Sequence, residues 1–300
     1  MMVSDDLVQR FTRLAFSPDP GLADAALLIA ALEYPRLNAA LYVELLDTLG
    51  REAAGRVAAA PAEVQDTPIG ADPVMYARVA ALNEYLFRDQ QFVGNETNYE
   101  DPRNSFLNEV LDRRTGIPLT LALVYMEVGR RAGIPLEGIN FPGHFLVRCT
   151  GGRGPGRPGL IVDAFHGGAV LSEEACRALL RRHAGDETLW ELHLEGCATK
   201  PQILARMLLN LKRIYVKMYS FPQARDITDL LLAVDPSALT ELRDRGLLAY
   251  HLNDYSTALR DLQAYLELSG RTDVDEEGKE EQARIWEHVK SLRRRVASFN

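Results

Sequence analysis

Three side chains in the middle of the chain have the types and spacing that could support chemistry. His144 opens an alternating apolar run, Asp163 lies in the next such run, and His166 follows three residues later. An imidazole beside a carboxylate can form an acid–base pair, and two histidines with an aspartate can hold a metal ion. The spacing matches no compact metal-binding motif, so we predict neither a metal nor another cofactor here. The simplest interpretation is an imidazole held by a carboxylate inside the fold.

Two short strands have to position these residues. The alternation predicts strands over His144–Cys149 and Leu160–Phe165. They would bring His144 and Asp163 to one face only in one register, which the sequence does not fix. Residues 151–159 between them hold five glycines and two prolines and lack the Gly-Lys-Ser/Thr ending of a phosphate-binding loop. We interpret this segment as a hairpin tip.

Helices are predicted on both sides of the strands. One begins near Pro118 and ends at Gly133, with apolar residues every three or four positions. Residues 5–60 and 74–87 show the same period, and Ser172 can cap a helix after the strands. One helix followed by neighbouring strands indicates an α+β fold, mostly helical, rather than an alternating βαβ arrangement.

The last third of the chain repeats itself. Five residues occupy tetratricopeptide repeat positions, and five more follow 34 residues later: Leu208, Leu211, Tyr215, Ala224 and Pro236, then Leu242, Arg245, Ala249, Ala258 and Gly270. The segment 275–297 reads as a charged terminal helix that would cap the stack. Such repeats present a groove that binds peptides, so we expect a protein or peptide partner.

Composition excludes several classes of protein. The chain has 300 residues, 47% hydrophobic and 25% charged, as in ordinary globular proteins of two or three domains. Its net charge of −8 gives no overall attraction to nucleic acid, and the longest apolar run, residues 25–32, is too short to cross a membrane. The chain has three cysteines, Cys149, Cys176 and Cys197. They lack the paired spacing that is typical of a disulfide framework or a structural zinc site. We therefore expect a cytoplasmic protein with no nucleic-acid or membrane partner.

The order of helix and strands resembles the transglutaminase-like core, a papain-like fold with a small antiparallel sheet. In that superfamily a cysteine at a helix start, a histidine and an aspartate form a catalytic triad. The resemblance assigns the last two positions to His144 and Asp163, and the cysteine position to Pro118. Because proline has no nucleophile, the resemblance implies an inactive centre. Thr120 or Ser105 could be a substitute nucleophile.

A narrower resemblance rests on four motifs. They are similar to motifs of the SirB-type family: residues 98–105, 113–118, 140–145 and 163–168. That family joins a helical part, a transglutaminase-like core and tetratricopeptide repeats, and its members are often labelled regulators of sirC expression. The resemblance implies three domains: a helical region over 1–95, the transglutaminase-like core over 96–196, and the repeats with a capping helix over 197–300.

Together these observations predict a pseudoenzyme rather than an enzyme. We expect a catalytically inactive transglutaminase-like domain with repeats, acting as a protein- or peptide-binding and regulatory module. Its predicted binding residues are Asn98, Tyr99, Asn104, Pro118, Asn140, His144, Asp163 and His166. The alternative is a hydrolase or amidase of the same class that uses a non-cysteine nucleophile or a metal ion.

Overall fold

The computed structural model describes residues 3–61, 67, 71–150, 159–185, 194, 196–270 and 275–297. The chain forms two compact units, one of Phe16–Met207 and one that combines Met1–Ala15 with Leu208–Asn300. Each unit is described by itself below. Most of the glycine-rich segment between the predicted strands, residues 151–158, lies outside the described residues.

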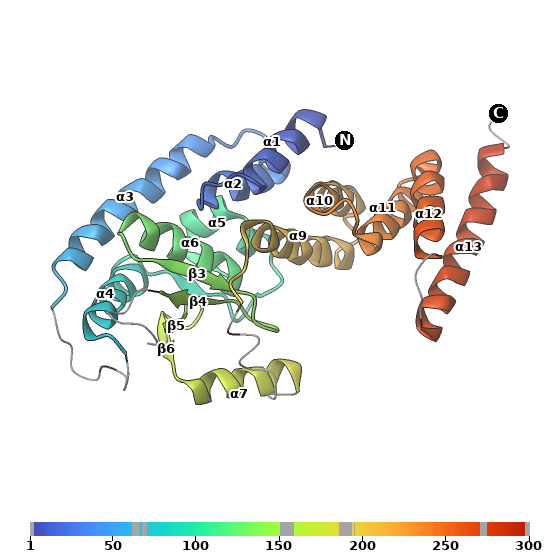
Figure 1. The fold of residues 1–300 in the computed structure, drawn as a ribbon. Coiled ribbons are helices and arrows are strands. Elements are labelled where there is room, and N and C mark those ends of the chain that lie inside the picture. The colour runs from blue at the N-terminus through green and yellow to red at the C-terminus, as the bar shows by residue number, and fades with distance from the viewer. Residues whose placement is uncertain are drawn as a thin grey trace. The chain divides into compact units, whose positions relative to one another are not determined.

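The unit Phe16–Met207 contains a small sheet covered by helices (Figure 1). Four antiparallel strands pair in chain order: β3 (Leu136–Ile139), β4 (Leu146–Cys149), β5 (Leu160–Asp163) and β6 (Ala169–Leu171). A separate parallel pair is formed by β1 (Val93–Gly94) and β2 (Thr115–Gly116). The α-helices described in this unit are α2 (Ala23–Glu33), α3 (Ala39–Ala58), α4 (Pro73–Asn83), α5 (Leu107–Arg113), α6 (Pro118–Arg131), α7 (Glu173–Ala184) and the part of α9 (Lys200–Lys217) that ends at Met207. The predicted fold, mostly helical with a small antiparallel sheet, is confirmed.

Helix α6 forms the centre of this unit, packed against β3 and β4. Every side chain from Pro118 to Gly129 is buried, because leucine, valine and alanine occupy nearly all faces of the helix. The one buried acid, Glu127, accepts a hydrogen bond from the Leu22 backbone N–H and pairs with Arg130 and Arg131. The carboxyl-terminal end of α6 is thereby joined to Leu22 and, through an ion pair of Arg131 with Asp47, to α3.

The other unit is a series of helical hairpins. Its helices are α1 (Asp5–Ala15), the part of α9 (Lys200–Lys217) from Leu208 onward, α10 (Phe221–Val234), α11 (Leu239–His251), α12 (Tyr255–Ser269) and α13 (Glu276–Ala297). Within it α11 packs on α12, and α12 on α13 (Figure 1). A Cβ at Gly246 would lie 2.7 Å from the Leu262 side chain, so a glycine there permits close approach of α11 and α12. These hairpins occupy the predicted repeat segments.

Helix α1 belongs to this second unit, although a long stretch of chain separates it from the hairpins. It packs against α10 and buries Phe11 and Ala15. Among the described residues, no helix combines the length and apolar character needed to cross a bilayer.

Candidate functional site

The structure brings together the three residues on which the sequence analysis began. His144 lies just before β4, and Asp163 is the last residue of the paired strand β5. The Nε2 atom of His144 lies 2.9 Å from Asp163 Oδ2, and the Nδ1 atom of His166 lies 2.7 Å from the same oxygen. His144 and Asp163 are buried, whereas the side chain of His166 is 48% exposed. The cluster therefore has a buried side and a side open to solvent.

A turn at Asp163 places His166 in this cluster. Asp163 Oδ1 accepts hydrogen bonds from the backbone N–H groups of Phe165 at 3.0 Å and His166 at 3.3 Å. This side-chain cap of a turn ends β5 at Asp163, so the predicted strand, which ran to Phe165, was two residues too long. The other oxygen, Oδ2, is left facing both imidazoles.

The charge state of Asp163 follows from its neighbours. Burial alone would raise the pKa of this carboxyl group, but the adjacent His144 and His166 outweigh burial and hold the pKa below its usual value. The group is therefore an ionised carboxylate at neutral pH, placed between two imidazole nitrogens.

Two further aromatic rings enclose His144. The ring of His183, on α7, lies parallel to it with centroids 6.2 Å apart, and the ring of Phe165 meets it edge-on at 6.0 Å. Gly143 has a left-handed φ of +65°, and a Cβ there would lie 2.5 Å from His183 Nδ1. The sequence did not predict His183. The one local signal near it is the dipeptide Pro142-Gly143, which is typical of a turn but does not show which helix packs against it.

Arg206, also missed from the sequence, fixes the backbone beside His144. Its guanidinium donates hydrogen bonds to Asn140 Oδ1 at 3.3 Å, to the Phe141 carbonyl at 3.1 Å and to the His144 carbonyl at 2.6 Å. Burial lowers the pKa of this guanidinium. Predicted residues Asn140 and His144 are therefore joined through an arginine on α9.

The remaining predicted residues form a second group at the start of α6. Asn104 is buried, and its Nδ2 donates to the Asn98 carbonyl at 2.8 Å. The Asn104 carbonyl accepts from Thr120 Oγ1 at 2.7 Å. Tyr99 reaches toward the histidine cluster, since its ring lies 6.4 Å from that of Phe165. This pair of rings is one contact between the two groups of predicted residues.

The start of α6 is where a nucleophile was considered. Pro118 is the first residue of the helix and is buried. The Thr120 hydroxyl donates to the Asn104 carbonyl and accepts from the Ile117 N–H at 3.1 Å, so it caps the helix. Ser105 is buried, and its hydroxyl has no hydrogen-bond partner within the described part of the chain. Among the described residues, neither hydroxyl forms a hydrogen bond with His144.

The two buried cysteines, Cys149 and Cys176, are unsuited to nucleophilic attack. Burial raises the pKa of Cys149 to about 12 and, together with the nearby Asp163 and Glu173, raises the pKa of Cys176 to about 11. Cys197 is exposed. At neutral pH the two buried cysteines are therefore neutral thiols.

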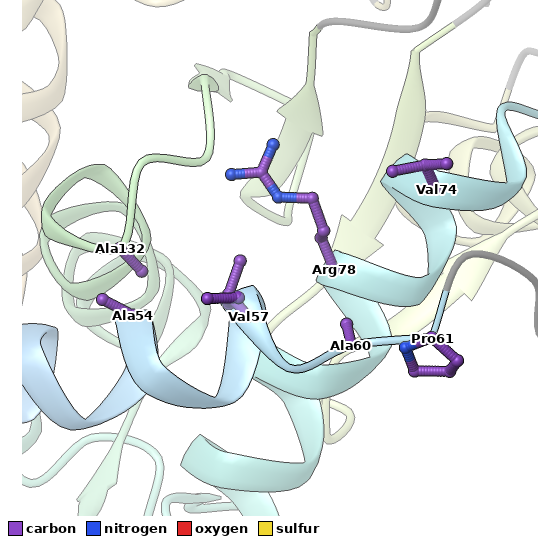
Figure 2. Close-up of a pocket in the computed structure, with 8 residues that line it drawn as sticks. Ala54, Val57, Ala60, Pro61, Val74, Arg78 and Ala132 are labelled. Atoms are coloured by element: carbon purple, nitrogen blue, oxygen red, sulfur yellow. The ribbon is translucent and has the colours of Figure 1, made fainter.

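A cavity of about 320 Å³ between α3 and α4 lies apart from this cluster (Figure 2). Small apolar side chains such as Ala54, Val57 and Ala60 line it, and Arg78 extends beside them from α4. The Arg78 guanidinium donates to the Gly133 carbonyl at 2.8 Å. Its lining holds no acid, histidine or thiol among the described residues, so it is not a candidate catalytic site.

Comparison with known proteins agrees with this architecture. A family model described as the transglutaminase-like superfamily matches residues 40–209, and a tetratricopeptide repeat model matches residues 211–293. A UPF0162 protein of Xylella fastidiosa (strain Temecula1) is 39% identical over 272 residues, 89% of this chain and 91% of the relative. A UPF0162 protein of Vibrio cholerae is 32% identical over 192 residues, 64% of this chain and 69% of that protein.

A eukaryotic protein is similar to part of this chain. F-box only protein 21 of Mus musculus is 35% identical over 180 residues, which are 57% of this chain but only 28% of that protein. The shared region is thus one part of a longer protein there. With a superfamily model over more than half of its length and a bacterial relative matched almost throughout, the chain belongs to the transglutaminase-like superfamily and is one of the UPF0162 proteins.

Proposed function

We propose that this protein is a catalytically inactive transglutaminase-like domain that, together with its tetratricopeptide repeats, binds a protein or peptide partner. The observation that carries the proposal is Pro118 at the first position of α6, where the resemblance to the superfamily requires a nucleophile. A proline side chain can neither lose a proton nor attack a carbonyl group. The SirB-type resemblance adds a regulatory role, and the three unpaired cysteines suit the reducing cytoplasm.

The surroundings of Pro118 support this proposal. The hydroxyl of Thr120 is engaged in two hydrogen bonds that hold the start of α6 to Asn104 and Ile117. Cys149 and Cys176 are buried thiols with raised pKa values. A histidine and a carboxylate without an adjacent nucleophile can still bind a ligand through hydrogen bonds or charge.

The repeat unit supports a binding role independently. Leu209 and Val216 are large apolar side chains, each 43% exposed, that lie seven residues apart on α9. That spacing places both on one face of the helix. An exposed apolar face on a tetratricopeptide repeat helix is a surface on which a peptide can bury its own apolar side chains.

The catalytic part of the proposal is tested by restoring the thiol. In a Cys197→Ser background, we expect Pro118→Cys to create a thiol with a pKa below the free value of about 8.5, because stabilisation of the thiolate by the helix N-terminus should outweigh the burial of this position. The pKa is measured from the pH dependence of alkylation. Pro73→Cys, at the first position of α4, is a matched control, since that helix start is capped by the Asp72 carboxylate.

The parent protein, which keeps Pro118, is tested in parallel for covalent labelling and for hydrolysis. We expect no adduct with serine- or thiol-directed probes at residues 104–120, and no hydrolysis of acyl or amide substrates with or without added zinc. Turnover that His144→Ala abolishes would overturn the proposed inactivity. A thiol pKa at or above about 8.5 in Pro118→Cys would contradict the inherited geometry.

The binding part needs a separate measurement. Peptides selected from a displayed library against the full chain are titrated against the parent, Leu209→Asp and His166→Ala. We expect at least one of the two variants to weaken binding by tenfold or more, roughly the loss of a single well-placed contact. Equal affinity for all three proteins would contradict binding at either surface.

A further inference from the structure

The histidine–aspartate–histidine cluster has the arrangement of a metal site. One atom from each of His144, Asp163 and His166 lies within 4.8 Å of the other two. Two imidazole nitrogens and one carboxylate oxygen are a ligand set that zinc and other divalent transition metals use, with a further position open. No short sequence motif indicates these three ligands, because His144 precedes β4 whereas Asp163 ends β5.

The strongest indication is the buried ring of His144. Its side chain is only 5% exposed, and among the described residues its Nε2 atom has no aligned hydrogen-bond partner. Asp163 Oδ2 lies 2.9 Å away as an ion-pair partner, but this contact does not have the geometry of a hydrogen bond. A buried ring nitrogen without a partner is costly, and a cation among the three ligand atoms would accept its lone pair.

The supports of these ligands favour the same interpretation. Asp163 Oδ1 accepts two backbone N–H groups, so the carboxylate cannot rotate and Oδ2 stays directed at both imidazoles. The backbone of His144 is held by Arg206 and Phe141. Such outer contacts orient metal ligands in proteins.

The spacing requires a small adjustment. Nitrogen and oxygen ligands of a tetrahedral zinc ion lie about 3.4 Å apart, given metal–ligand bonds of about 2.0–2.2 Å. The distances here are 2.9 and 2.7 Å, so the rings would have to move outward by roughly half an ångström or slightly more. His166 is half-exposed and can move, and its exposed side provides the entry path.

We propose that His144 Nε2, Asp163 Oδ2 and His166 Nδ1 bind one divalent transition-metal ion of the zinc class. The ion would be held by three protein atoms and keep at least one position for water or a ligand atom. This inference does not rest on the proposed binding function, because a metal can be bound whether or not a partner is.

The test is a metal titration of the full-length protein after treatment with a chelator. Zn²⁺ is titrated in competition with a chromophoric chelator, and Co²⁺ reports coordination number through its visible absorption. We expect one equivalent bound by the parent, with His166→Ala weakening binding by about 100-fold or more. His183→Ala removes a neighbouring imidazole outside the ligand set and should change the affinity only a few-fold.

A second variant distinguishes the loss of a metal ligand from a loss of folding. Asp163→Asn keeps an oxygen that can accept the two backbone N–H groups but removes the negative charge, so it should fold and yet bind Zn²⁺ weakly. Circular dichroism verifies that His166→Ala and Asp163→Asn remain folded. Failure of the parent to bind one equivalent, unchanged binding by His166→Ala, or equal losses in His166→Ala and His183→Ala would each overturn the proposal.

Discussion

Asp163 shows how one residue can combine two structural tasks. One carboxylate oxygen caps the turn that ends β5, and the other faces His144 and His166. The sequence could predict that His144 and Asp163 belong to two neighbouring strand segments, because alternation is visible in a single chain, but it placed Asp163 inside its strand rather than at the end. It could not show the turn that brings His166 back, nor His183, whose position depends on where α7 packs.

Cysteine accessibility gives a prediction at the residue scale. A thiol reagent should modify Cys197 first in the native protein, because Cys149 and Cys176 are buried with pKa values of about 12 and about 11. A time course of alkylation followed by peptide mass spectrometry measures the three rates. Modification of Cys176 as fast as that of Cys197 would show that it is accessible and reactive, contrary to the structure.

Asp226 on α10 gives a prediction about pH. Desolvation raises the pKa of this carboxyl group from 3.8 to about 6, and its Oδ1 has no partner among the residues described. Well below pH 3.8 this carboxyl group is protonated in both the folded and unfolded states. Between pH 4 and 6 the unfolded state releases the proton first, so the folded unit loses stability as the pH rises.

The substitution Asp226→Asn should remove this loss of stability at higher pH. The substitution should stabilise the protein above pH 6 by about 1–2 kcal/mol, allowing for partial exposure, and should have little effect below pH 4. Urea denaturation across this pH range measures it, with Asp6→Asn, an exposed acid on α1, as the control. A gain in stability that is independent of pH would contradict the raised pKa of Asp226.

At the scale of elements, the helices were easier to predict than their ends. Helix α6 begins at Pro118, and Gly133, at a φ of +73°, follows its end, as the sequence predicted. Ser172 caps α7 by accepting from the Ala175 N–H. The π-helical segment Glu84–Asp89 was not predicted, because residues 74–87 keep a regular helical period and only packing distinguishes the two geometries.

The cap of α6 can be tested by an isosteric change. Thr120→Val keeps the shape but leaves the Ile117 N–H and the Asn104 carbonyl without this partner in a buried site. We expect a loss of about 1–3 kcal/mol in the free energy of unfolding. Thr228→Val is the control, since that hydroxyl bonds only a carbonyl of its own helix. Equal effects of both substitutions would mean that the cap contributes nothing specific.

At the scale of the whole molecule, the units do not follow the order of the chain. The sequence predicted one amino-terminal helical region over residues 1–95, whereas α1 clusters with the hairpins α10–α13. A helical period shows that a segment has an apolar face but not which distant helix will cover it. The pairing of α1 with α10 could therefore not be predicted from the pattern alone.

Phe11 tests this pairing. It is fully buried on α1, so Phe11→Ala should destabilise the protein by about 3–5 kcal/mol. Hydrogen exchange should become faster in α10, while Gln9→Ala, at an exposed position of the same helix, should leave it unchanged. If exchange in α10 is the same in both variants, α1 does not stabilise the hairpins.

The pairing of α1 with α10 also sets an order of events during synthesis. Helix α1 is synthesised before Phe16–Met207, and its partner α10 begins only at Phe221. Until then the apolar stripe of α1 has nothing of its own unit to cover it, and a nascent chain offers that stripe to chaperones. The discontinuous unit is consequently the last to reach its native state, after the continuous one has been translated.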